Sequence, residues 1–129
     1  MKLEVGMYVR FKDKRSNTYI RKIIDIPKDN RYASIYIDKE ANYTNHLSFK
    51  NVLKASNSII DLIEVGDYVN ELPVEGYYTR YDEEKDDYIK IGIVTLEDYW
   101  KGTFTSVEDI KSIVTKEAFE SMEYKLGDK

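Results

Sequence analysis

Two stretches of the sequence repeat each other, and this repeat constrains the fold more than any other feature. Residues 3–9 (LEVGMYV) recur as residues 63–69 (IEVGDYV), with five of the seven positions identical. A weaker echo follows in each half, where residues 48–52 (SFKNV) match residues 106–110 (SVEDI). The two matches lie 60 and 58 residues apart. The chain is therefore predicted to contain two copies of one module of about 60 residues.

The residues of each module predict short strands. Gly6 and Gly66 permit a turn or bulge, and the Tyr and Val that follow each glycine favour a strand. Further strands are predicted over residues 19–26, 32–38, 77–81, 88–94 and 110–114. Turns are predicted over residues 27–30 and 82–87, and one helical turn over residues 106–109.

Five short strands with a helical turn before the last strand is the order of a small SH3-like barrel. We therefore expect a mainly β fold of two tandem SH3-like barrels with short helical connectors. The expected boundaries are a basic unit over 1–58, a short apolar connector over 59–66, and an acidic unit over 67–129 with a short C-terminal helix capped by Thr115. Because units of this size bury little surface alone, we expect them to pack together.

Charge divides between the two halves. Residues 1–62 carry 12 Lys and Arg against 7 Asp and Glu, a net of +5, and residues 63–129 carry 8 against 17, a net of −9. The sequence has no cysteine, no apolar run long enough to span a membrane and no signal-peptide pattern at its start. These features predict a cytoplasmic protein with two different partner-facing surfaces, or two halves that attract each other.

No pattern in the chain points to catalysis. Phosphate-binding and dinucleotide-binding glycine motifs are absent, and His46 is the single histidine. Without cysteine, one histidine makes no zinc site of the usual kind, and it reads as a partly exposed loop residue. We therefore expect a protein that is not an enzyme and that uses no cofactor and no metal.

The densest acidic run lies in the predicted turn over residues 82–87. It holds five acidic residues: Asp82, Glu83, Glu84, Asp86 and Asp87. The run lacks the glycine and the ligand order of a calcium loop. It reads either as a solvated hairpin tip or as a surface that occupies a basic groove on a partner.

Tyrosine is frequent in this chain, at 12 of 129 residues, and it gathers with the single tryptophan in the second half. Such side chains offer rigid contact area with a polar tip, and interfaces are enriched in them. Tyr81, Tyr99 and Trp100 are therefore candidate partner-binding residues beside the acidic run. Trp100 either plugs the barrel or projects from it, and we favour the first.

The first half carries a basic stretch over residues 10–22. Its candidate nucleic-acid-binding residues are Arg10, Lys14, Arg15, Arg21 and Lys22, with Phe11 and Tyr19 interleaved. Basic groups beside aromatic rings are typical of single-strand binding. Alternation of charged and apolar residues is equally typical of a half-buried strand that binds nothing, and the stretch could also contact the acidic half.

The second opening motif continues as EVGDYVN, and the chain later reads DIKSIVTKEAFE over residues 109–120. These two segments resemble a pattern found in small uncharacterised proteins of phages and prophages of low-GC Gram-positive bacteria. Some small acidic proteins of such mobile elements inhibit host defence nucleases, anti-CRISPR proteins among them. The resemblance implies no catalytic residues.

Two functions from different classes follow. The first is a non-enzymatic binding protein of a mobile element. It would use its acidic, tyrosine-rich surface to inhibit a host defence protein that binds nucleic acid in a basic groove. The second is a nucleic-acid-binding accessory module that uses the basic first half.

Overall fold

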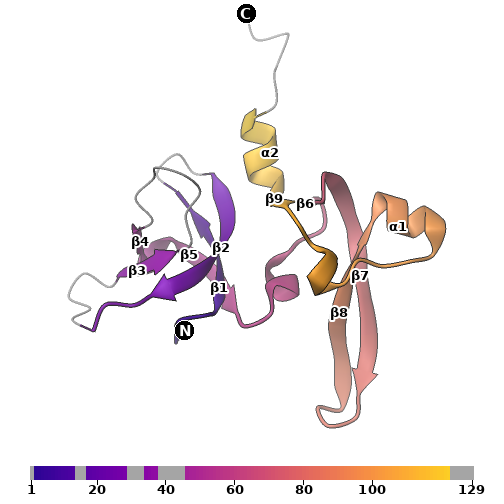
Figure 1. The fold of residues 1–129 in the computed structure, drawn as a ribbon, viewed down its shortest axis with the longest axis horizontal. Coiled ribbons are helices and arrows are strands. Elements are labelled where there is room, and N and C mark those ends of the chain that lie inside the picture. Colours follow the sequence, from indigo (N-terminus) through magenta and orange to yellow (C-terminus); the bar gives the residue numbers. More distant parts are fainter. Residues whose placement is uncertain (1, 14–16, 29–33, 38–45, 123–129) are drawn as a thin grey trace, which may run out of the picture. The chain divides into compact units, whose positions relative to one another are not determined.

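The computed structural model describes residues 2–13, 17–28, 34–37 and 46–122 (Figure 1). It divides into two compact units, Met1–Leu62 and Ile63–Lys129. Each unit is built around an antiparallel sheet, which confirms the prediction of a mainly β fold. No helix in the described ranges has both the length and the apolar composition needed to cross a membrane. The packing of the two units against each other stays a prediction.

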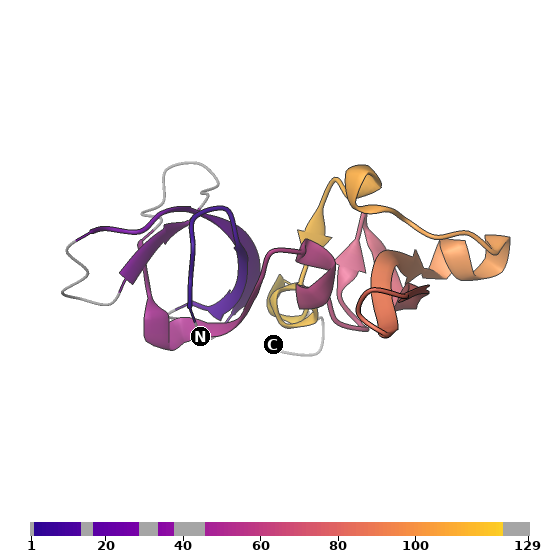
Figure 2. The ribbon, with the colours of Figure 1, turned by 90° about the horizontal axis from the view of Figure 1, so that it is seen from below.

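The first unit is a curled, five-stranded half-barrel, whose curvature is visible in Figure 2. Its elements are β1 (Tyr8–Lys12), β2 (Thr18–Asp25), β3 (Ser34–Ile37), β4 (His46–Ser48), the 3₁₀ turn η1 (Phe49–Asn51), β5 (Val52–Ser56) and the 3₁₀ turn η2 (Ile59–Leu62). The strand order is β4-β3-β2-β1-β5. The sheet closes over an apolar core that includes Val9, Phe11, Ile23, Ile35 and Leu47.

The second unit carries a four-stranded sheet in the order β8-β7-β6-β9. Its elements are β6 (Tyr68–Val69), β7 (Leu72–Asp82), β8 (Asp87–Thr95), α1 (Leu96–Lys101), the 3₁₀ turn η3 (Val107–Asp109), β9 (Ile113–Val114) and α2 (Lys116–Met122). Asn70 and Glu71 join β6 to β7 with φ of 52° and 69°. Two consecutive residues with positive φ form the type of two-residue turn that matches the twist of a hairpin.

The two repeated openings have the same backbone geometry. Gly6 and Gly66 have φ of 94° and 98°, a region that only glycine enters without strain. The Gly6 N–H donates to the Ile23 carbonyl at 2.9 Å, and the Gly66 N–H donates to the Val74 carbonyl at 3.0 Å. Each glycine thus turns the chain into a central strand, β1 in one unit and β6 in the other.

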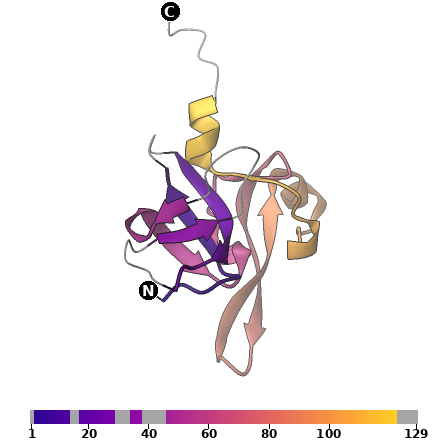
Figure 3. The same cartoon turned by 60° about the vertical axis from the view of Figure 1, so that its left-hand side comes forward.

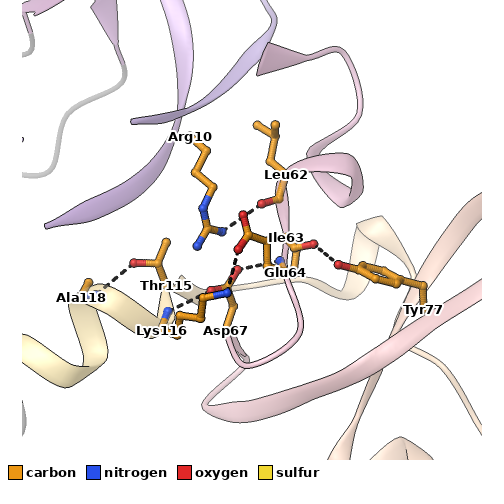
Figure 4. A network of polar contacts seen from close by, with 9 residues as sticks. All are labelled: Arg10, Leu62, Ile63, Glu64, Asp67, Tyr77, Thr115, Lys116 and Ala118. Carbon is orange, nitrogen blue, oxygen red and sulfur yellow. Dashed lines mark hydrogen bonds and ion pairs between the residues drawn. The ribbon is translucent and has the colours of Figure 1, made fainter. Parts of the chain in front are cut away.

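The repeated corners differ at one position, which is Met7 in the first unit and Asp67 in the second. The Glu4 N–H points to the Met7 sulfur at 3.2 Å, whereas the Glu64 N–H donates to the Asp67 carboxylate at 2.8 Å. Asp67 is fully buried and also accepts the Lys116 N–H at 2.9 Å, so it fixes the start of α2 to the corner (Figure 4). The second copy of the corner therefore holds the start of a helix through its carboxylate. The first copy has a methionine at that position and no such carboxylate.

The second echo of the repeat also keeps its geometry. The Val52 N–H closes η1 on the Phe49 carbonyl, and the Ile110 N–H closes η3 on the Val107 carbonyl. Both turns follow a serine in extended conformation, but neither serine side chain caps its turn. In contrast, the Thr115 hydroxyl does accept the Ala118 N–H at 3.1 Å, the cap expected for the C-terminal helix.

Candidate binding surface on the second unit

The β7–β8 hairpin runs on as a two-stranded ribbon past the rest of its sheet (Figure 3). β7 pairs with β8 from Val74 to Asp82, whereas its pairing with β6 is limited to Leu72 and Pro73. Among the described residues, β8 is the only strand paired with β7 beyond Val74. We call residues 76–92 the arm. The consecutive residues Tyr78–Tyr81 are all exposed, so both faces of the arm carry exposed side chains beyond its base.

The end of the arm is the acidic turn predicted from the sequence, residues 82–87, which we call the acidic tip. Asp82 pairs with Asp87, and the Asp82 carboxylate accepts the Glu84 N–H at 2.9 Å. Asp86 has a φ of 50°, and the Asp87 carboxylate accepts the Tyr88 N–H at 2.7 Å. Local bonds thus shape the turn, and its carboxylates other than the half-buried Asp82 are exposed to water.

Two tyrosines flank the acidic tip. Tyr81 and Tyr88 are cross-strand partners whose rings meet edge to face at 5.4 Å between centroids. They are 45% and 68% exposed, so most of the pair faces solvent. The Tyr81 hydroxyl donates a hydrogen bond to Asp86, which raises the pKa of Tyr81, with a smaller contribution from desolvation. This bond ties one ring to the turn.

The base of the arm holds more aromatic contacts. The Lys90 ammonium lies 3.9 Å from the centre of the Tyr77 ring, whose hydroxyl bonds the Ile63 carbonyl. Tyr78 stacks on Phe104 with 4.3 Å between ring centroids. The rings of Tyr77 and Tyr78 are thus already in contact with other side chains, a lysine in one case and a phenylalanine in the other.

The structure separates the predicted site into two parts. Tyr99 and Trp100 lie on α1, which begins where β8 ends, whereas the acidic tip lies at the start of β8. β8 has 9 residues, which at about 3.3 Å per residue places its ends roughly 26 Å apart. Tyr81 and the five acidic residues are brought together, but Tyr99 and Trp100 belong to another surface. Trp100 is 78% exposed, so the expectation that it plugs a barrel is wrong.

Helix α1 is not among the elements predicted from the sequence. The local signals were present: Thr95 accepts the Asp98 N–H, Asp98 accepts the Thr95 N–H, and Gly102 ends the helix with a φ of 70°. This reciprocal pair is a capping box followed by a C-terminal glycine. The third helical position holds an aspartate where a capping box usually has glutamate or glutamine, so the pattern is weaker in the sequence than in the structure.

Asp98 is a buried anchor and not a reactive group. Its carboxylate accepts hydrogen bonds from the Thr95 backbone and from three hydroxyls, those of Thr95, Thr103 and Thr105, at 2.7–3.1 Å. Burial raises the pKa of Asp98, but the bonds from Thr103, Thr105 and Thr95 together outweigh it and leave the pKa below its usual value. The carboxylate therefore stays ionised and joins α1 to the segment that follows it.

The basic stretch is smaller than the sequence suggested. Arg10 is 2% exposed and donates to the Leu62 carbonyl at 3.0 Å, so its expected role in contacting phosphates is wrong. Lys22 is exposed, and Arg21 is half-buried with its guanidinium 5.3 Å from the Tyr19 ring. Lys14 and Arg15 lie outside the described residues.

The described residues offer little to suggest a metal or a catalytic centre. They contain no group of three or more His, Cys, Asp or Glu placed to hold an ion. A shallow depression is lined by Asn70, Glu71, Asp109, Lys111 and Ser112, but the Asn70 amide already bonds the backbone of three of these neighbours. His46 lies in β4, so the expectation that it is a loop residue is wrong, and its side chain is outside the described set.

No protein-family model, curated protein or solved structure matches the chain. The function is therefore inferred from the geometry and charge of the arm.

Proposed function

We propose that the protein is a binding protein that acts by occupancy, inserting the acidic tip of its arm into a basic, nucleic-acid-binding groove of a protein partner. The observation that carries the proposal is the arm itself. A two-stranded ribbon is marginally stable alone, yet this one projects with both faces exposed and ends in five acidic residues. Such a shape fits insertion better than it fits a role in the core.

The charge of the acidic tip supports a basic partner. Its five acidic residues and Lys85 give a net charge of −4 within six residues. A groove that binds nucleic acid is built to contact closely spaced negative charges. Carboxylates at the end of a projecting arm would enter it first, and long-range attraction would speed association at low salt.

The tyrosines support the same kind of partner. Tyr81 and Tyr88 present exposed ring faces beside the carboxylates. Arginine binds carboxylates through paired hydrogen bonds and stacks on aromatic faces, and it is frequent where proteins contact phosphates. The combination therefore suits an arginine-bearing groove.

The class of partner is part of the proposal. A host defence nuclease has the required basic groove, and the resemblance to phage and prophage proteins favours it. Blocking that groove would prevent nucleic acid from binding, which is the anti-CRISPR-like inhibition expected from the sequence. Catalysis by this chain is not needed for such a function.

We also infer that the first unit is SH3-like. Its strand order places β1 between β2 and β5, and η1 stands directly before β5. The second unit keeps β6 between β7 and β9 with η3 before β9. The long arm and α1 would then be additions to a shared plan, and this favours the second unit as the one that gained a binding role.

The proposal is tested with two variants of equal charge. The tip variant carries Asp82→Asn, Glu83→Gln, Glu84→Gln and Asp87→Asn, and it keeps Asp86 so that the Tyr81 bond remains. The control variant carries Glu71→Gln, Glu75→Gln, Glu108→Gln and Glu120→Gln, four exposed positions outside the tip. Each immobilised protein is incubated at low salt with nuclease-treated bacterial lysate, and the proteins retained are identified.

We expect the wild type and the control variant to retain the same nucleic-acid-binding protein from the lysate, and the tip variant not to retain that protein. The purified partner should then bind labelled DNA or RNA more weakly when the wild type is present. Equal retention by all three proteins, or capture without competition, would exclude the proposal. A direct mobility shift of nucleic acid by the wild type would instead favour the rival function of the basic unit.

A further inference from the structure

The arm has an unpaired backbone edge. β8 is the outermost strand of its sheet, with β7 on its inner side. Within the described residues, no strand pairs with the outer edge of β8 from Asp87 to Ile91. In an antiparallel pair, every second residue turns its N–H and C=O away from its neighbour. This edge therefore presents backbone donors and acceptors over about the length of an ordinary strand, although the Tyr88 N–H within it already donates to the Asp87 carboxylate at 2.7 Å.

The chain already pairs with this edge at one point. Thr105 forms an antiparallel bridge with Ile93, in which the Ile93 N–H donates to the Thr105 carbonyl at 2.9 Å and the Thr105 N–H donates to the Ile93 carbonyl at 2.7 Å. The outer edge of β8 can thus accept a backbone in extended conformation. The pairing stops at that residue, and the edge toward the acidic tip stays open.

The acidic tip at one end of the edge favours a basic partner, whereas the edge itself carries Asp87 and Lys90, whose charges balance. The open edge begins at Asp87, within the acidic tip, so a strand lying along it would end among carboxylates. A second copy pairing through its own β8 edge would bring another unit with a net charge of −9 to the same place. A strand with basic side chains would instead meet opposite charge at the acidic tip. Proteins recognise exposed sheet edges by adding such an extended strand to them.

We propose that β8 binds an extended, basic segment of a protein partner by strand addition along residues 87–91. This inference rests on the proposed function and adds the mode of binding. Backbone hydrogen bonds to the β8 edge supply affinity, and the acidic tip sets the charge of the segment. Side chains on alternate positions would lie over Tyr88 and Lys90 on one face and over Ile89 on the other.

The test uses the full chain and a synthetic peptide of about nine residues that alternates arginine and valine. A matched peptide carries N-methyl groups on alternate backbone nitrogens along one edge, which removes donors but keeps the charge. Binding of each peptide is measured by isothermal titration calorimetry. Amide hydrogen exchange of residues 87–91 is followed with and without the unmodified peptide.

We expect the unmodified peptide to bind and the N-methylated peptide to bind at least about tenfold more weakly. We also expect the outward amides of residues 87–91 to exchange more slowly in the complex. Equal binding of both peptides without protection of these amides would overturn strand addition and leave the proposed acidic contact standing. Absence of binding by either peptide would count against both. Protection that appears without peptide, together with a dimeric mass, would assign the edge to a second copy.

Discussion

The ring of Phe104 lies over Gly92, in the space that a side chain at Gly92 would occupy. A Cβ there would also lie 3.0 Å from the Thr105 carbonyl oxygen. The ring stacks on Tyr78 across the base of the arm. Glycine at this position therefore lets the segment after α1 close over one face of the arm, at the point where the ribbon leaves the rest of its unit.

Gly92→Ala should lower the free energy of unfolding by about 1–3 kcal/mol, because the added methyl group displaces the Phe104 ring and crowds the backbone of Thr105. Gly76→Ala is the matched control, since no atom lies within 4 Å of a Cβ at that position. It should leave stability unchanged or slightly raised. Urea unfolding followed by circular dichroism measures both. Equal destabilisation by the two variants would contradict this account.

The Asp98 carboxylate should make stability depend on pH. Its folded-state pKa lies below the unfolded value of about 4, so its stabilisation is complete above that value and is lost as the pH falls through the folded-state pKa. Asp98→Asn should lower the melting temperature at pH 7 and reduce its fall as the pH drops below about 4. Glu75→Gln, at an exposed position, should leave the profile unchanged. A wild-type slope retained in Asp98→Asn would count against the role of Asp98.

Asn70 should fix the segment between η3 and β9. Its side-chain amide donates to the Asp109 carbonyl at 2.8 Å and accepts the Lys111 N–H at 2.7 Å and the Ser112 N–H at 3.2 Å. Asn70→Gly keeps the positive φ available but removes all three bonds. We expect a loss of about 1–3 kcal/mol and faster hydrogen exchange at the amides of Lys111 and Ser112. Unchanged exchange there would show that the turn alone holds the segment.

Local chemistry in the sequence was enough to predict several elements. The glycine-opened corners, the acidic turn between β7 and β8 and the Thr115 cap depend on residues close to one another in the chain. The site was only partly predictable. Tyr81 stands next to the turn in sequence and is held to it by Asp86, whereas the length of β8, which separates the tip from α1, is a property of the fold.

Arg10 shows why the basic surface could not be predicted from alternation. Arg10 lies on the opposite face of β1 from the core residues Val9 and Phe11, so alternation places it in solvent. η2 packs against β1 and β5, and the Leu62 carbonyl accepts the guanidinium. Alternation does not predict exposure in a strand that is covered on both faces. No residue near Arg10 in the sequence indicates that η2 covers this face of β1.

Arg10→Ala should lower the free energy of unfolding by about 1–3 kcal/mol, because it leaves the Leu62 carbonyl without its buried donor and removes the packing of the arginine stem. Lys22→Ala, at an exposed position in the same sheet, should change it by less than about 0.5 kcal/mol. Urea unfolding of the two variants makes the comparison. If Arg10→Ala is as stable as Lys22→Ala, the guanidinium is solvated and belongs with the basic surface after all.

The distance between the acidic tip and α1 gives the binding proposal its most specific consequence. Tyr88→Ala should weaken binding of the arginine–valine peptide by about fivefold or more, because an exposed ring beside the carboxylates is lost. Trp100→Ala removes a larger and more exposed ring, but from the far end of β8, and it should change the affinity by less than about twofold. Isothermal titration calorimetry at one salt concentration measures both variants, and circular dichroism confirms that each is folded. A greater loss of affinity from Trp100→Ala than from Tyr88→Ala would assign the binding surface to α1. The exposed aromatic side chains there would then contribute more to binding than the charge of the acidic tip.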